Sequence, residues 1–114
     1  MSERRIFDYL QDILEAGRRI GEYSTGMTYE AFQRDHKTQD AVIRNLEVIG
    51  EAAKNIPEPF RRKYPDLPWK EMAGMRDRLI HHYFGVNLDI VWDVIRGELP
   101  GVLENIEGIF PEIG

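Results

Sequence analysis

Apolar residues recur along most of this chain at alternating spacings of three and four, which is the period of an amphipathic α-helix. The first run predicts a helix over about residues 3–22, and Gly17 on its apolar face indicates a close crossing with another helix. Thr28 is a suitable cap for a short helix. A second long run predicts a helix that is capped by Thr38 and ended by Pro57. Two long helices are therefore expected in the first half of the chain.

The second half of the chain continues the same period in shorter runs. Pro68 is suited to open a helical turn, and the helix that carries residues 76–83 is expected to end at Gly85, which tolerates the left-handed backbone that closes a helix. Asn87 is expected to cap a further helix, and a last helix covers residues 99–110. No alternating strand pattern appears. The sequence therefore predicts an all-α helical bundle of four main helices plus one or two short ones.

The length and composition indicate one ordinary globular domain over residues 1–114. The chain has no cysteine, which excludes disulfides and thiolate metal sites and fits the reducing cytoplasm. Its first residues lead directly into an amphipathic pattern, which predicts neither a signal peptide nor a membrane-spanning helix. We therefore expect a cytoplasmic protein with no membrane partner.

The net charge is −5, which argues against a protein that coats nucleic acid non-specifically. The charge is uneven, however, because residues 61–78 hold six positive and three negative side chains. This basic segment is compatible with a ligand that bears phosphate. By itself, a solvated helix face is the simpler interpretation.

Residues 76–83, with the sequence RDRLIHHY, form the most unusual segment of the chain. On a helix, Arg76 lies at the centre of an arc of apolar side chains, and Asp77 and His81 form an i,i+4 pair on its flank. A charge in an apolar stripe is costly unless it has a partner or a function. Two plainer interpretations remain, in which Arg76 forms a structural ion pair and Tyr83 is a packed residue at a helix end.

The residue types in this segment suit the binding and cleavage of a phosphodiester. A guanidinium binds phosphate oxygens through paired N–H groups, and a histidine can deliver or remove a proton. In the last turn of the expected helix, backbone carbonyls and Asp77 favour the charged form of His81. Arg76 and His81 point about 140° apart on one helix, so a two-fold dimer that surrounds a shared cleft with both copies gives a more complete site.

No metal or cofactor site is expected. His81 and His82 diverge on a helix, His36 is the only other histidine, and no His-x-x-x-His spacing occurs. The chain also lacks a glycine-rich phosphate loop and a Gly-x-Ser-x-Gly elbow. Any chemistry at residues 76–83 is therefore expected to be carried by side chains.

The R-x4-H-x-Y spacing of Arg76, His81 and Tyr83 resembles the signature of the HEPN superfamily, and in particular of its HepT-like branch. Three further segments resemble the same branch: residues 45–53 (NLEVIGEAA), 67–76 (LPWKEMAGMR) and 84–92 (FGVNLDIVW). The resemblance extends from about residue 41 to residue 95.

That branch contains the toxin halves of bacterial toxin–antitoxin pairs. The resemblance implies a HEPN-type bundle that forms a homodimer and cleaves RNA as a metal-independent endoribonuclease, with no cofactor. Arg76 and His81 match the family's catalytic pair, and Asp77 matches the supporting polar residue beside the arginine. Tyr83 matches the tyrosine that the partner, a minimal nucleotidyltransferase antitoxin, silences by AMPylation.

Two other functions remain open at this point. In the first, the chain is a non-catalytic accessory subunit of a nucleotidyltransferase, and this subunit binds nucleotide or substrate in the same cleft. In the second, it is a purely structural dimer in which Arg76 and Asp77 form an ion-pair network at the interface.

Overall fold

Helices occupy most of the chain. The computed structural model describes residues 3–81 and 85–113, and within them the side chains of residues 5–79 and 85–110. The helices are α1 (Glu3–Ser24), α2 (Tyr29–Arg34), α3 (His36–Lys54), α4 (Glu58–Lys63), α5 (Trp69–Ala73), α6 (Met75–Leu79), α7 (Leu88–Asp93) and α8 (Leu99–Ile113). A π-helical turn, Val94–Glu98, joins α7 to α8, and two short strands, β1 (Ile80–His81) and β2 (Gly85–Val86), follow α6.

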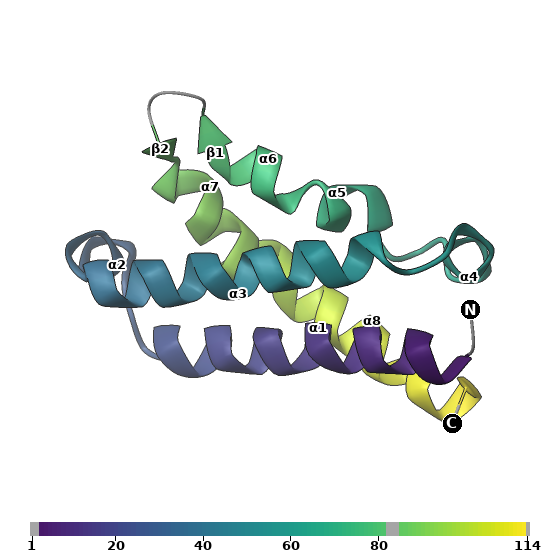
Figure 1. Cartoon of the computed structure of the whole chain (residues 1–114). Coiled ribbons are helices and arrows are strands. Elements are labelled where there is room, and N and C mark those ends of the chain that lie inside the picture. Colours follow the sequence, from purple (N-terminus) through teal and green to yellow (C-terminus); the bar gives the residue numbers. More distant parts are fainter. Residues whose placement is uncertain (1–2, 82–84, 114) are drawn as a thin grey trace.

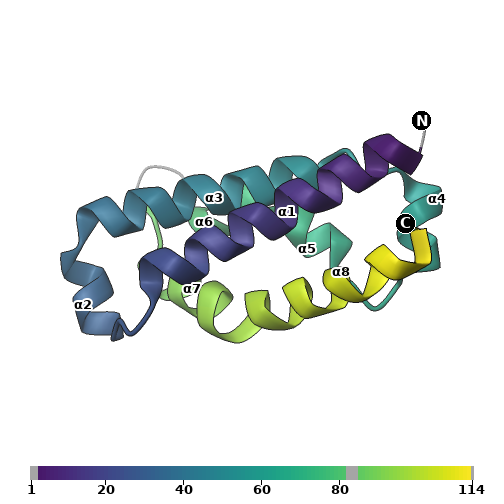
Figure 2. The same ribbon diagram turned by 90° about the horizontal axis from the view of Figure 1, so that it is seen from below.

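Helices α1 and α3 form the frame of the molecule. They run antiparallel and side by side, with α2 at the end where the chain turns from one to the other (Figures 1 and 2). The continuous helical stretch from α7 to α8 crosses this pair, and α5 and α6 cover the side of α3 that faces away from α1 (Figure 1). The predicted all-α helical bundle is therefore confirmed.

The core lies between these layers and is apolar. Leu10 and Ile13 of α1, Leu46 and Ile49 of α3, and Ile106 of α8 are almost inaccessible to solvent. Each such side chain contributes about 1.5–3 kcal/mol through burial alone. The spacings of three and four that predicted amphipathic helices therefore mark the residues that hold the three long helices together.

Gly17 lies where α1 crosses α8, as its place in the apolar stripe predicted. A Cβ atom at this position would lie 2.5 Å from the side chain of Leu103.

Within the described residues, no helix combines the length and the apolar character that a membrane span requires.

The helix caps are only partly those that the sequence predicted. Thr28 caps α2 and Asn87 caps α7, where their side-chain oxygens accept hydrogen bonds from backbone N–H groups at 3.1 and 3.2 Å. The prediction that Thr38 caps the second long helix was wrong, because the cap is Asp35, three residues earlier, and α3 begins at His36. The Asp35 carboxylate accepts the backbone N–H of Thr38 at 2.9 Å and its hydroxyl at 2.7 Å, so Thr38 is the donor in this cap.

The two C-terminal helices of the sequence prediction are one continuous stretch. At the π-helical turn, the N–H of Leu99 donates to the carbonyl of Val94, five residues earlier. The next residue, Pro100, has no N–H to continue the ordinary α-helical ladder, and the widened turn directly precedes it.

Candidate functional site around Arg76

The segment of residues 76–83 begins on α6 and continues into a small β-hairpin. Helix α6 follows α5 after the single residue Gly74, and both short helices pack on α3. The strands β1 and β2 then project beyond α6 at one end of the molecule (Figure 1). Tyr83, His82 and the side chain of His81 lie outside the described residues.

The expectation that one helix runs through this segment to Gly85 was wrong. Helix α6 ends at Leu79, and β1 pairs antiparallel with β2 so that Ile80 faces Val86 and His81 faces Gly85. The carbonyl of Leu79 accepts the N–H of Asn87 at 2.9 Å, which closes the base of the hairpin. Gly85 does adopt the predicted positive φ, 78°, but it does so in β2 and not as a helix cap.

Two expectations for His81 assumed that it lies on the same helix as Arg76. His81 stands in extended backbone beyond the end of α6, so the 100° step of a helix does not relate it to Arg76 or to Asp77. The helix-end carbonyls that were expected to favour its charged form are likewise not at the predicted place. Isoleucine, the residue type at position 80, is more common in strands than in helices.

Arg76 is exposed, and the expectation that it sits within an apolar arc was also wrong. Met75 and Leu79 of α6 are buried, with 4% and 1% of their surface accessible, whereas Arg76 between them in sequence faces solvent. The reason is the break at Gly74, which starts a new short helix, so the apolar residues of α5 and α6 do not form one continuous stripe.

Arg78, on the same short helix, is held in place by an ion pair. Its two terminal nitrogens donate to the Glu98 carboxylate at 3.1 and 2.9 Å, which ties α6 to the π-helical turn. The hydrogen bond to Glu98 raises the pKa of the Arg78 guanidinium above its ordinary value. Arg78 therefore has a structural role that fixes the position of α6.

Arg76 and its neighbour Asp77 differ from Arg78 in this respect. Both are exposed, and neither side chain forms a hydrogen bond or an ion pair with any other described residue. Other arginines of the chain serve the fold: Arg61 donates to carbonyls at the end of α3, and Arg96 donates to Ser24 at the end of α1. The guanidinium of Arg76 is thus free to bind a ligand.

Gly50 of α3 allows the segment that carries Arg76 to lie close to the frame. A Cβ atom at Gly50 would lie 3.2 Å from the carbonyl oxygen of Met72 and 3.3 Å from the Cβ of Met75. These contacts are tighter than ordinary packing, so a side chain at this position would push α5 and α6 away from α3.

A groove of about 210 Å³ opens between α3 and α6 next to this contact. Its charged lining residues are Arg44, Glu47, Glu51 and Lys54 from α3 and Arg76 from α6. The four α3 residues were not among the predicted site residues, although their spacing of three, four and three places four charges on one face of a helix. We refer to this hollow as the α3–α6 groove.

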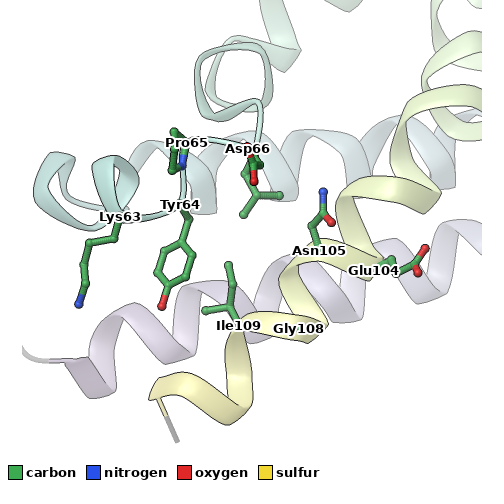
Figure 3. Close-up of a pocket in the computed structure, with 9 residues that line it drawn as sticks. Lys63, Tyr64, Pro65, Asp66, Glu104, Asn105, Gly108 and Ile109 are labelled. Carbon is green, nitrogen blue, oxygen red and sulfur yellow. The ribbon is translucent and has the colours of Figure 1, made fainter.

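A second hollow, of about 400 Å³, lies between the connector from α4 to α5 and the middle of α8. Figure 3 shows the Tyr64 ring extending from the connector toward α8, with Ile109 and Asn105 on the opposite side. None of the predicted site residues lines this hollow. Across the described part of the chain, no group of three or more His, Asp or Glu side chains is arranged to hold a metal ion.

A helical bundle with an unpaired arginine beside a charged groove defines a class of binding or catalytic domain, and the sequence comparisons identify the family. The family model described as Ribonuclease HepT-like matches residues 13–109. The chain belongs to this family, which is part of the HEPN superfamily.

Named relatives cover nearly the whole chain. A Methanocaldococcus jannaschii protein that is provisionally named an RNase is 50% identical over 113 residues, which are 99% of this chain and 93% of the relative. A Thermococcus cleftensis protein named probable ribonuclease HepT is 50% identical over 88% of this chain and 91% of its own. A Caldanaerobacter subterraneus protein, also provisionally named an RNase, is 46% identical over 89% of this chain and 90% of its own. No solved structure matches the chain.

Proposed function

We propose that this protein is a metal-independent endoribonuclease, the toxin of a toxin–antitoxin pair, which acts on RNA in the cytoplasm as a homodimer. The observation that carries the proposal is the free, exposed guanidinium of Arg76 beside a charged groove, in a member of a ribonuclease family. The names of the relatives, which call them RNases, support RNA as the substrate.

In the proposed reaction, the 2′-hydroxyl of a ribose attacks the adjacent phosphorus and the bond to the leaving 5′-oxygen breaks. His81 takes the hydroxyl proton or donates one to the leaving oxygen, and Arg76 stabilises the negative charge that develops on the phosphoryl oxygens. Asp77, the carboxylate next to Arg76 in sequence, has a supporting role beside the catalytic pair of Arg76 and His81. The products end in a 2′,3′-cyclic phosphate and a 5′-hydroxyl.

The homodimer supplies what one chain does not. A two-fold axis next to α6 would place both copies of Arg76 and His81 around one cleft, so one histidine can act as base and the other as acid. The α3–α6 grooves of the two chains would then form the walls of this cleft.

The proposed role of the 2′-hydroxyl as nucleophile can be tested by comparing RNA with DNA. Purified protein should cleave single-stranded RNA in the presence of EDTA and leave DNA of the same sequence intact, because DNA lacks the 2′-hydroxyl. Mass spectrometry of the fragments should detect the cyclic phosphate. Cleavage of DNA, or dependence on an added metal, would contradict the mechanism. If no RNA is cleaved, the protein is instead an accessory subunit that binds nucleotide or substrate.

Regulation of the enzyme is proposed to act through Tyr83. A minimal nucleotidyltransferase, as the cognate antitoxin, transfers AMP from ATP to the Tyr83 hydroxyl and releases pyrophosphate. The added phosphate would compete with RNA for Arg76 by occlusion and by charge repulsion. Incubation of the two proteins with ATP should add the mass of AMP to the peptide that contains Tyr83, and Tyr83→Phe should escape silencing. AMP on another residue would contradict this assignment.

A further inference from the structure

The α3–α6 groove carries both signs of charge. Arg44, Glu47, Glu51 and Lys54 line it from α3, in this order along the helix, and Arg76 lines it from α6. Their spacings of three, four and three residues place the α3 side chains on one face of that helix. The groove is thus a row of charges that begins at the proposed ribonuclease site.

These charges do not neutralise one another. Arg44, Lys54 and both glutamates form no ion pair or hydrogen bond through their side chains with any other described residue. Glu47 and Glu51 are also an i,i+4 pair of like charge, which disfavours an isolated helix. The groove therefore offers free donors and free acceptors, and its residues are not explained by the stability of the fold.

A nucleotide has the complementary chemistry. Its phosphate attracts arginine and lysine, and this contact is independent of the base. A carboxylate only accepts hydrogen bonds, so it pairs with the exocyclic amino groups of bases, as when Glu accepts from N4 of cytosine. Carboxylates would not increase the affinity of a surface that bound only the RNA backbone. They would increase the affinity of a surface that also binds a base.

We propose that the α3–α6 groove is a nucleotide-binding subsite, in which Arg44 and Lys54 each contact a different RNA phosphate, beyond the one held by Arg76. The two α3 carboxylates select a base that has an exocyclic amino group. This inference rests on the proposed ribonuclease function and adds a substrate preference to it. Uracil is disfavoured because it has a carbonyl oxygen at position 4 where cytosine has an amino group, so a carboxylate placed to accept from that amino group would face an acceptor.

The test compares two ligands that differ mainly in this amino group. Oligocytidylate and oligouridylate of equal length are titrated by fluorescence anisotropy into His81→Ala protein, which keeps the groove and stops cleavage. The cytidine oligomer should bind about tenfold more tightly. In the Glu47→Gln/Glu51→Gln variant this preference should disappear, because a glutamine amide can also donate to uracil O4. Glu107→Gln, an exposed substitution on α8 with the same kind of charge change, should preserve it.

A second, independent measurement tests the proposed phosphate contact of Arg44. Arg44→Gln should weaken the binding of both oligomers equally and reduce the salt dependence by about one unit of slope, as expected for a lost phosphate contact. Arg34→Gln is the matched control, since Arg34 is exposed on α2 and does not line the groove.

The outcomes separate the subsite from the ribonuclease function. An unchanged cytidine preference in the double glutamine variant, equal affinity for both oligomers in the parent protein, or no binding of either would overturn the subsite. Cleavage by the protein with His81 intact is measured separately. Base-selective binding without any cleavage would retain the subsite and reject the ribonuclease, and cleavage without base-selective binding would do the reverse.

Discussion

At the scale of single residues, two arginines on one short helix have opposite roles. Arg78 is fixed by Glu98 at 3.1 and 2.9 Å, whereas the side chain of Arg76, two positions earlier, forms no hydrogen bond or ion pair with a described residue. Both are arginines with similar neighbours in sequence. They differ because the Glu98 carboxylate lies opposite Arg78. The motif identified Arg76 by its spacing from His81, but only the structure shows that its guanidinium is free.

Asp35 gives a prediction at this scale. The hydrogen bonds from the Thr38 backbone and hydroxyl lower the pKa of the Asp35 carboxyl below its ordinary value. A lowered folded-state pKa means that the charged cap stabilises the protein above the unfolded pKa of about 3.9, and that this contribution is lost as the pH falls through the folded value. Urea unfolding of the wild type and Asp35→Ala should therefore differ at pH 7 and converge toward pH 2–3.

The control for this prediction is Asp40→Ala, which removes an exposed carboxylate from the same helix that forms no hydrogen bond with another described residue. Its effect on unfolding should be smaller at pH 7. A difference between the wild type and Asp35→Ala that stays constant down to low pH would show that the cap does not depend on the charge.

At the scale of the elements, the sequence predicts the long helices and the capped short helices α2 and α7, but it does not predict the breaks in the segment after Pro68. α1 and α3 follow from apolar residues repeated over several turns, because a long stripe has one helical phase. The segment after Pro68 holds only five residues in α5 and five in α6, and Gly74 resets the phase between them. The apolar pattern alone could not show this break, and it could not show that Ile80 leaves the helix for a strand.

The contact of α5 and α6 with α3 gives the second prediction. Gly50→Val should insert a branched side chain against the Met72 carbonyl and Met75, and should lower the free energy of unfolding by about 1–3 kcal/mol. RNA cleavage should fall as well, since Arg76 would move with α6. Gly21→Val is the matched control, because a Cβ atom at Gly21 has nothing within 4 Å. Equal unfolding midpoints in urea for the two variants would contradict this prediction, because the close contact at Gly50 would then not affect the stability of the protein.

At the scale of the whole molecule, the fold presents the Arg76 surface on an outer layer. α5 and α6 cover one side of α3, and the opposite side of that helix is covered by α1 (Figure 1). The all-helical architecture could be predicted from the sequence, since every long apolar run has a helical period. The groove could not, because it depends on how closely two segments far apart in sequence approach at Gly50.

The proposed homodimer gives the third prediction. Sedimentation equilibrium at micromolar concentration should give twice the mass of the chain, and a stable interface should bury about 1,200–2,000 Å² in total. Arg76→Glu should change the self-association of the chain, because it reverses the charge of both copies of residue 76 at the proposed shared cleft, whereas Arg34→Glu, on α2, should not. A monomer at these concentrations would contradict the shared cleft.

The rate of RNA cleavage in EDTA tests the central claim, that Arg76 and His81 form a ribonuclease site, most directly. The initial rate should fall by on the order of a hundredfold or more in Arg76→Ala and in His81→Ala, because each removes a group that acts in the transition state. Lys37→Ala, an exposed substitution near the start of α3 and outside the groove, should cleave as the wild type does. Wild-type rates in Arg76→Ala and His81→Ala would contradict the account, since the nuclease activity would then come from another site or another protein.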